Sequence, residues 1–323
     1  MLSSKVFRNV SVGLFLALIS VTSAFAGSWE DAIEDVEAKA DRYWEFGRSR
    51  GAFTWLGTAY NELGIPQHQC AILGRMLGFE EHIRHLEEFD DPELRPDLSE
   101  DELQQLMYHS HFLSNWVFTA RRLVGSSDDT RQQIWNLDCV GHQGIPDSLF
   151  VGLADSSAKL IVAGNDIRVL GDFEVGFYQR FEQFVEANPQ AERIVLGSGG
   201  GSVRDAIMTG LLIRRLGLAT TLSQNCYSAC PLAFLGGVDR TIWSPYPKLG
   251  FHRVSRADGA QVSFDEPVYE TIELFVSEMG ANPDFVMRHI FAAAPTEFSY
   301  PELDDLCKAA VTTWIQRLCS SDD

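Results

Sequence analysis

Basic residues are scarce in this 323-residue chain. Lysine and arginine number 26 against 45 aspartates and glutamates, which gives a formal net charge of −19 at pH 7. A surface of that sign repels phosphate backbones and anionic lipids. The sequence therefore argues against binding to nucleic acid or to a membrane surface.

Long hydrophobic runs are missing after the first residues. Near the N-terminus, Lys5 and Arg8 precede an apolar run from Val12 to Ile19, and small residues end at Ala24-Phe25-Ala26. This pattern is typical of a cleaved secretory signal, and the run is too short for a comfortable membrane anchor. We therefore expect a signal peptide at residues 1–26 and a periplasmic mature protein without membrane insertion.

Cysteines are few and even in number. In an oxidising compartment disulfides are favoured over thiols, although six cysteines allow fifteen full pairings. Cys226 and Cys230 can pair if the local backbone brings their Cα atoms close enough, and the compartment favours this bridge. The six cysteines are Cys70, Cys139, Cys226, Cys230, Cys307 and Cys319.

The sequence has no internal repeat, but its pattern changes near Ile145-Pro146. Over residues 27–145, apolar residues recur three and four positions apart, for example around Trp44 and Trp55, which predicts a helical domain. The acidic, proline-containing stretch 87–100 predicts an exposed loop. We also expect segment 135–140 to tie this part to the rest of the chain through Cys139.

Residues 146–323 alternate between short β-rich runs and helical patterns. This alternation predicts a layered α/β domain with parallel crossover units. Glycine and asparagine between the first two runs predict a hairpin. The expected strands are 158–162, 167–170, 193–196 and 219–222, and the clearest helices are 203–216 and 228–235.

A glycine-rich turn joins one of these strands to a helix at residues 196–203, Leu-Gly-Ser-Gly-Gly-Gly-Ser-Val. Such a turn can aim backbone N–H groups at negative charge. A phosphate loop would need a lysine here, and a dinucleotide fingerprint would need its third glycine beyond Gly201. Two interpretations of this turn remain: a site that binds an oxyanion, or a turn with a purely structural role.

Two further segments follow in order. Ser228 stands just before an apolar helix with Pro231 in its first turn, where a serine is commonly an N-cap. His252 ends the strand-like run Leu249-Gly-Phe-His, where a lone histidine is commonly structural. Each residue alone indicates no chemistry, so only the ordered set of three segments is informative.

Together the three segments resemble the proteolytic subunit of Clp proteases and its crotonase-fold relatives, including secreted Clp-like proteins. The resemblance covers roughly residues 158–313 and implies a layered domain with repeated β-β-α units. It implies Ser228 as nucleophile and His252 as its general base. The oxyanion hole would then be formed by Gly200, Gly201 and Ala229.

This sequence departs from the family pattern in two places. Gly199 stands where the family usually has proline, and Thr296 stands where an aspartate would orient the histidine. Glu297, Asp284 and Asp304 are the alternatives for that role. Without an orienting carboxylate, the catalytic triad becomes a dyad.

The resemblance implies a serine hydrolase, most simply a peptidase with a peptide or protein substrate and no cofactor. The alternative is a degenerate Clp-like module that binds peptides or scaffolds an envelope complex, and acyl-thioester chemistry ranks third. The sequence does not decide whether the protein forms a homo-oligomer. We expect no metal site, because His82 and His85, or the cluster 108–111, lack a second ligand group at diagnostic spacing.

Overall fold

The computed structural model describes residues 26–52, 64–87, 91–243, 246–256, 258–316 and 318–319. The expected signal peptide therefore lies outside the described residues except for Ala26, and so does Trp55. No helix among the described residues has both the length and the apolar character needed to cross a bilayer.

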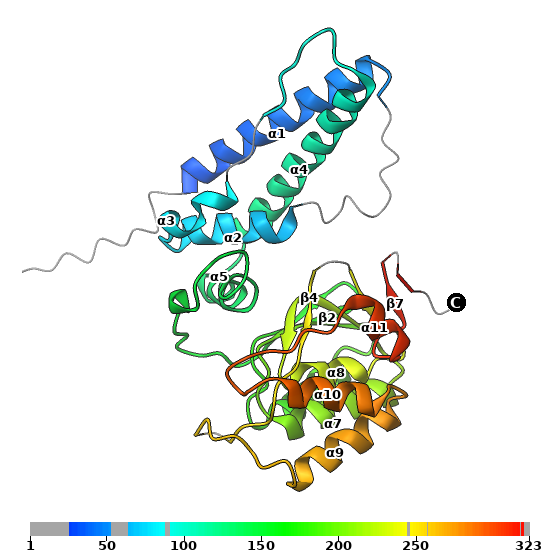
Figure 1. Cartoon of the computed structure of the whole chain (residues 1–323). Coiled ribbons are helices and arrows are strands. Elements are labelled where there is room, and N and C mark those ends of the chain that lie inside the picture. The colour runs from blue at the N-terminus through cyan, green and yellow to red at the C-terminus, as the bar shows by residue number, and fades with distance from the viewer. Residues whose placement is uncertain are drawn as a thin grey trace, which may run out of the picture.

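The first part of the chain is helical, as the periodicity predicts. Helices α1 and α4 lie side by side, and the shorter α2 and α3 pack near one end of the pair (Figure 1). The elements are α1 (Ala26–Ser49), α2 (Ile65–Met76), α3 (Glu80–Ile83), the 3-10 helix η3 (Arg84–Leu86), α4 (Glu100–Val124), α5 (Asp128–Ile134), the π-helix η4 (Trp135–Cys139) and the 3-10 helix η5 (Asp147–Leu149).

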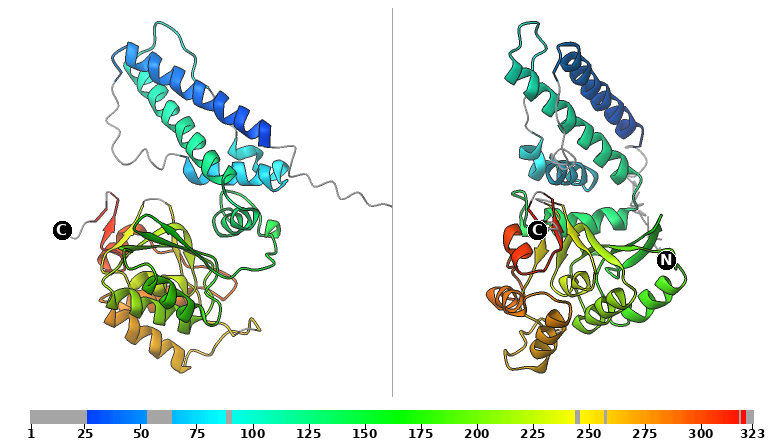
Figure 2. Two further views of the ribbon diagram at one scale, coloured as in Figure 1. Left: turned by 180° about the vertical axis from the view of Figure 1, so that it is seen from behind. Right: turned by 90° about the vertical axis from the view of Figure 1, so that its right-hand side faces the viewer.

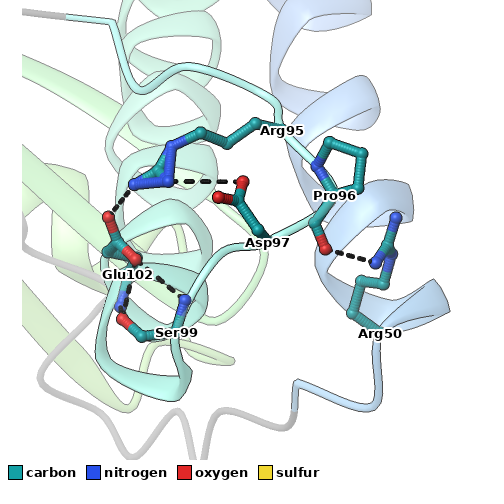
Figure 3. A network of polar contacts seen from close by, with 6 residues as sticks. All are labelled: Arg50, Arg95, Pro96, Asp97, Ser99 and Glu102. Atoms are coloured by element: carbon teal, nitrogen blue, oxygen red, sulfur yellow. Dashed lines mark hydrogen bonds and ion pairs between the residues drawn. The ribbon is translucent and has the colours of Figure 1, made fainter.

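A capping box fixes the start of α4 (Figure 3). The backbone N–H of Glu102 donates to Ser99 Oγ at 3.3 Å, and the backbone N–H of Ser99 donates to the Glu102 carboxylate at 2.8 Å. This reciprocal pair satisfies N–H groups that a helix start otherwise leaves unpaired. Arg95 also pairs with Glu102, which ties the preceding loop to the helix. The described residues 91–99 of the predicted acidic loop contain no helix or strand.

The second part is a sheet with helices, so the predicted α/β architecture after a helical region is confirmed. The sheet order is β1-β2-β3-β4-β5-β7, and β6 pairs with β4. Strands β1 and β2 pair antiparallel, in the predicted hairpin, and the other strand pairs that the structure describes are parallel. The strands are β1 (Lys159–Ala163), β2 (Asp166–Leu170), β3 (Arg193–Ser198), β4 (Ala219–Tyr227), β5 (Arg240–Ile242), β6 (Leu249–Gly250) and β7 (Trp314–Ile315).

Helices bury one face of this sheet. Figure 1 shows α7, α8, α9 and α10 on the side away from α1 and α4, and the second view in Figure 2 agrees. The apolar core here includes Ile194, Phe234 and Val286, all fully buried. The helices are α6 (Phe177–Glu186), α7 (Val203–Arg215), α8 (Cys230–Leu235), α9 (Pro267–Glu278), α10 (Pro283–Ala292) and α11 (Leu303–Lys308).

Two expectations near Ser228 need correction. Strand β4 continues to Tyr227 instead of ending at Leu222, and the following helix begins at Cys230 instead of Ser228. Polar residues interrupt the apolar run after Leu222, but the strand continues because the buried side chain of Asn225 is hydrogen-bonded. Ser228 is therefore a turn residue and not a helix cap.

All six cysteines are paired, as Cys70–Cys139, Cys226–Cys230 and Cys307–Cys319. The favoured bridge between Cys226 and Cys230 is thus present. The role expected for Cys139 is wrong, because its partner in α2 belongs to the same helical part. The link to the sheet is made by the neighbouring residues Leu137 and Asp138 instead.

Candidate active site

Ser228 lies in a sharp turn between β4 and α8. Its φ of 60° is left-handed, a region that residues other than glycine rarely adopt and that is often kept at functional sites. Its backbone N–H donates to the carbonyl of Gly250 at 2.9 Å, and the disulfide Cys226–Cys230 encloses the turn. The serine is therefore held, half-buried, between a strand and a helix.

The glycine-rich turn after β3 packs directly against this serine. A Cβ on Gly200 would lie 2.4 Å from Ser228 Cβ and 2.9 Å from its Oγ, so only glycine fits there. A Cβ on Gly201 would lie 2.4 Å from the carbonyl oxygen of Phe173. Both glycines have positive φ, 110° and 117°, which glycine adopts without strain.

The N–H groups near Ser228 differ in their availability. The N–H of Gly200 donates to Ser198 Oγ at 3.0 Å, so it is not available to an oxyanion. Gly200 instead leaves room for the side chain of Ser228, because it has no Cβ. The N–H groups of Gly201 and Ala229 are engaged in no hydrogen bond within the described residues. Unengaged backbone donors next to a nucleophilic hydroxyl are what an oxyanion hole requires, and both residues border the same cavity as Ser228.

His252 follows β6 and reaches the same place. The structure brings it together with Gly201, Ser228 and Ala229 around one small cavity of about 50 Å³. The described residues show no hydrogen bond between Ser228 Oγ and the imidazole. Such bonds are often long in unliganded sites and shorten only when substrate is bound.

Burial lowers the pKa of His252, and the backbone carbonyl of Pro295 acts in the opposite direction. The imidazole is therefore mainly neutral at pH 7, the form in which it can accept a proton. Its Nδ1 is buried and makes no hydrogen bond of normal geometry within the described residues. The ring of Phe298 contacts the imidazole edge-on, with centroids 5.1 Å apart.

None of the residues considered as orienting group hydrogen-bonds to His252. Thr296 and Glu297 line a larger cavity next to the site, and Asp284 lines a separate cavity beside α9. Asp304 lies in the first turn of α11. Within the described chain, no carboxylate therefore orients the imidazole.

The larger cavity, of about 990 Å³, was not predicted from the sequence. The segment 133–156 forms one wall, and the others come from the ends of β2 and β3 and from residues 296–300. Gly199 and Tyr227, the neighbours of Gly200 and Ser228, line it, so it adjoins the small cavity. Its walls come from distant segments without a shared motif, so no sequence signal marked it.

Asp138 joins the helical part to the strand that carries Ser228. Its Oδ1 accepts the backbone N–H of Asn225 at 2.9 Å, and its Oδ2 accepts the Gln69 amide at 2.7 Å and the Tyr246 hydroxyl. Asn225 in turn donates to the carbonyl of Leu137 at 3.1 Å. Burial raises the pKa of Asp138 to about 6, and these hydrogen bonds act against that shift.

The histidines considered as metal ligands lie elsewhere. His82 is in α3, and His85 in η3 contacts the backbone carbonyl of Gln143 at 2.7 Å. His109 contacts Asp91 at 3.1 Å. Across the ranges that the structure describes, no three His, Cys, Asp or Glu side chains are grouped closely enough to hold a metal ion.

Neither the comparison with protein-family models nor the comparison with curated proteins gives a match. Among solved structures, the chain is similar to a variant of ClpP1 from Listeria monocytogenes, with 11% identity and a TM-score of 0.39 over 47% of this chain and 91% of that chain. A variant of the 1510-N membrane-bound stomatin-specific protease is similar with 15% identity and a TM-score of 0.36, over 47% of this chain and 77% of that chain. A peptidase from Plasmodium falciparum is similar with 8% identity and a TM-score of 0.36, over 47% of this chain and 96% of that chain. The first of these, ClpP1, is a Clp protein, the family that the three motifs resemble.

Proposed function

We propose that this protein is a serine hydrolase of peptide bonds in which Ser228 is the nucleophile and His252 the general base. The observation that carries the proposal is that a strained serine, a half-buried imidazole of lowered pKa and two unengaged backbone N–H groups border one cavity. His252 would take the hydroxyl proton as Ser228 attacks the carbonyl. Gly201 and Ala229 would then stabilise the oxyanion, each donor contributing about 3 kcal/mol.

A fluorophosphonate probe tests this assignment, because it reacts with an activated serine hydroxyl. The oxidised protein should be labelled at Ser228, and Ser228→Ala should abolish labelling. Ser255 lines the same small cavity but is exposed and is not held in the turn, so Ser255→Ala should be labelled normally. Labelling that persists in Ser228→Ala would assign the reactive group elsewhere.

A peptide-binding module without hydrolysis is the second candidate. It is favoured by the unpartnered Nδ1 of His252 and by the lack of an orienting carboxylate in the described residues. If the folded, oxidised protein binds peptides but neither labels nor cleaves, this second function replaces the first.

We further propose that the protein acts in the periplasm. The signal-like residues 1–26 and the three disulfides support this location. Expression of the full chain in a bacterial host should give a periplasmic product whose mass lacks residues 1–26. An intact N-terminus retained in the cytoplasm would contradict the proposal.

A further inference from the structure

The large cavity beside the site carries negative charge. Three carboxylates line it, those of Asp147, Asp172 and Glu297, and none of its described lining residues is a lysine or arginine. The exposed Lys248 approaches from outside the lining, with its Nζ 5.8 Å from the centre of the Tyr300 ring. The wall of the cavity is therefore suited to a positively charged group.

Asp172 lies beside the glycine-rich turn. A Cβ on Gly199 would lie 2.8 Å from its Oδ1, so the side chain lies directly against that turn. It is half-buried, and burial raises its pKa while the side chain of Ser156 and the backbone of Gly199 act in the opposite direction. A cation bound beside Asp172 would offset this cost of burial.

A second, independent observation concerns Gln133, which also lines the cavity. This side chain is 2% exposed, lines the cavity, and has no hydrogen-bond partner for either amide atom within the described residues. A buried amide without partners is costly, and such groups usually have a ligand, a water or another role. After a change of side-chain rotamer, the oxygen of Gln133 could accept from one peptide unit of a bound chain, and its nitrogen could donate to the same unit.

Aromatic rings complete the wall nearest Ser228. Tyr227 and Phe298 stack with centroids 4.5 Å apart, and Tyr300 meets Tyr227 at 6.0 Å. Their faces can attract an ammonium or guanidinium group and cover the aliphatic part of a long side chain. The described carboxylates are not grouped as metal ligands, so the spread of charge suits an extended organic cation.

We propose that this cavity binds a lysine or arginine side chain of the substrate peptide, with Gln133 holding the adjoining peptide unit. The inference rests on the proposed hydrolase function, because Tyr227 and Gly199 connect the cavity to the serine. It names the substrate class as cationic peptides. The residues that would select them come mainly from the segment 133–156 and from Asp172 and Glu297.

Binding can be measured without hydrolysis on the full mature chain carrying Ser228→Ala. The probes are two fluorescein-labelled alanine-serine peptides that differ at one central position, lysine in one and norleucine in the other. The lysine peptide should bind about tenfold more tightly at low salt, and raising the salt should reduce the difference. Equal affinities of the two peptides would overturn the proposal.

Substitutions test the role of the carboxylates and the role of the Gln133 amide separately. Asp172→Asn should reduce the preference for lysine about fivefold, whereas Glu278→Gln, the same charge change on exposed α9, should leave it unaltered. Gln133→Leu should weaken both peptides alike while raising the melting temperature, because it removes an unpaired buried amide. A preference that survives Asp172→Asn together with Glu297→Gln would also refute the proposed site.

The outcomes separate this inference from the function on which it rests. Fluorophosphonate labelling of Ser228 without a preference for lysine would leave the hydrolase and remove the cationic subsite. A lysine preference that depends on Asp172, in a protein that is never labelled, would keep the subsite and remove the hydrolase.

Discussion

Two buried polar regions of this molecule differ in how their atoms are matched. At the junction between the helical part and the sheet, both carboxylate oxygens of Asp138 accept hydrogen bonds. At the candidate site, Nδ1 of His252 and both amide atoms of Gln133 make no hydrogen bond of normal geometry within the described residues. The hydrogen bonds at the junction are thus complete in the unliganded chain, whereas buried polar atoms at the candidate site remain without a hydrogen bond of normal geometry.

An unpaired atom by itself does not identify a site. The hydroxyl of Thr209 and the amide of Gln316 are also buried and unpartnered within the described chain, yet neither lines one of the cavities at the site. Gln133 and His252 differ because each borders a cavity next to Ser228. The comparison predicts that substitutions at the site reduce activity, whereas substitutions at the junction reduce stability.

The largest expected effect is on catalysis. His252→Ala should slow fluorophosphonate labelling about 1000-fold, roughly 4 kcal/mol, with little change in melting temperature. The matched control is His289→Ala in α10, because His289 hydrogen-bonds to Ser299 at 2.8 Å and does not line the small cavity. Loss of folding in His252→Ala would place this histidine with the structural residues.

Removing disulfides should have the next largest effect, and the loss of stability should differ between the two regions. Replacing both Cys70 and Cys139 by alanine should cost about 4 kcal/mol, since this bridge closes a long loop, with a sequence separation of 69. Replacing Cys226 and Cys230, only 4 apart, should cost about 2 kcal/mol. Denaturant unfolding measures both, and equal costs would contradict the assignment of the first bridge to the scaffold.

Asp138 predicts the pH dependence of stability at the junction. Its folded-state pKa of about 6 exceeds the usual 3.8, so the folded chain binds the proton more tightly than the unfolded chain does. Its contribution to stability is therefore full below about pH 4 and declines as pH rises through about 6, by up to about 3 kcal/mol. The free energy of unfolding of wild type relative to Asp138→Asn should fall over that range. A flat difference would mean that Asp138 is ionised throughout.

The smallest effect is expected far from both regions. Ser99→Ala removes the N-cap of α4 and should lower the free energy of unfolding by about 1 kcal/mol, without any change in labelling. Thr271→Ala, an exposed hydroxyl within α9, serves as control and should change stability by less than about 0.5 kcal/mol. A change in labelling with Ser99→Ala would connect the helical part to the site.

The sequence predicted the elements whose signal is local. The hairpin of β1 and β2 and helix α7 follow from apolar runs bounded by glycine or asparagine. The end of β4 was missed because its polar residues are stabilised by partners distant in the chain, such as Leu137 for Asn225. Local patterns contain no information on such partners.

The site was predicted only in part, because some of its features depend on residues that are distant in the chain. Glycine turn, serine and histidine are three short ordered motifs, and the structure places Gly201, Ser228 and His252 around one cavity. The use of the Gly200 N–H by Ser198 was not visible in the sequence. Neither was the larger cavity, because its walls join segments from residue 133 to residue 300.

The order in which these walls occur along the chain has a consequence for biosynthesis. Segment 133–156 is made before any strand of the sheet, and Thr296–Tyr300 is made almost last. A chain truncated before residue 296 would still contain Ser228 and His252, but one side of the substrate compartment would be open. Under the proposed function, nascent or clipped copies that lack this wall should therefore hydrolyse peptides poorly.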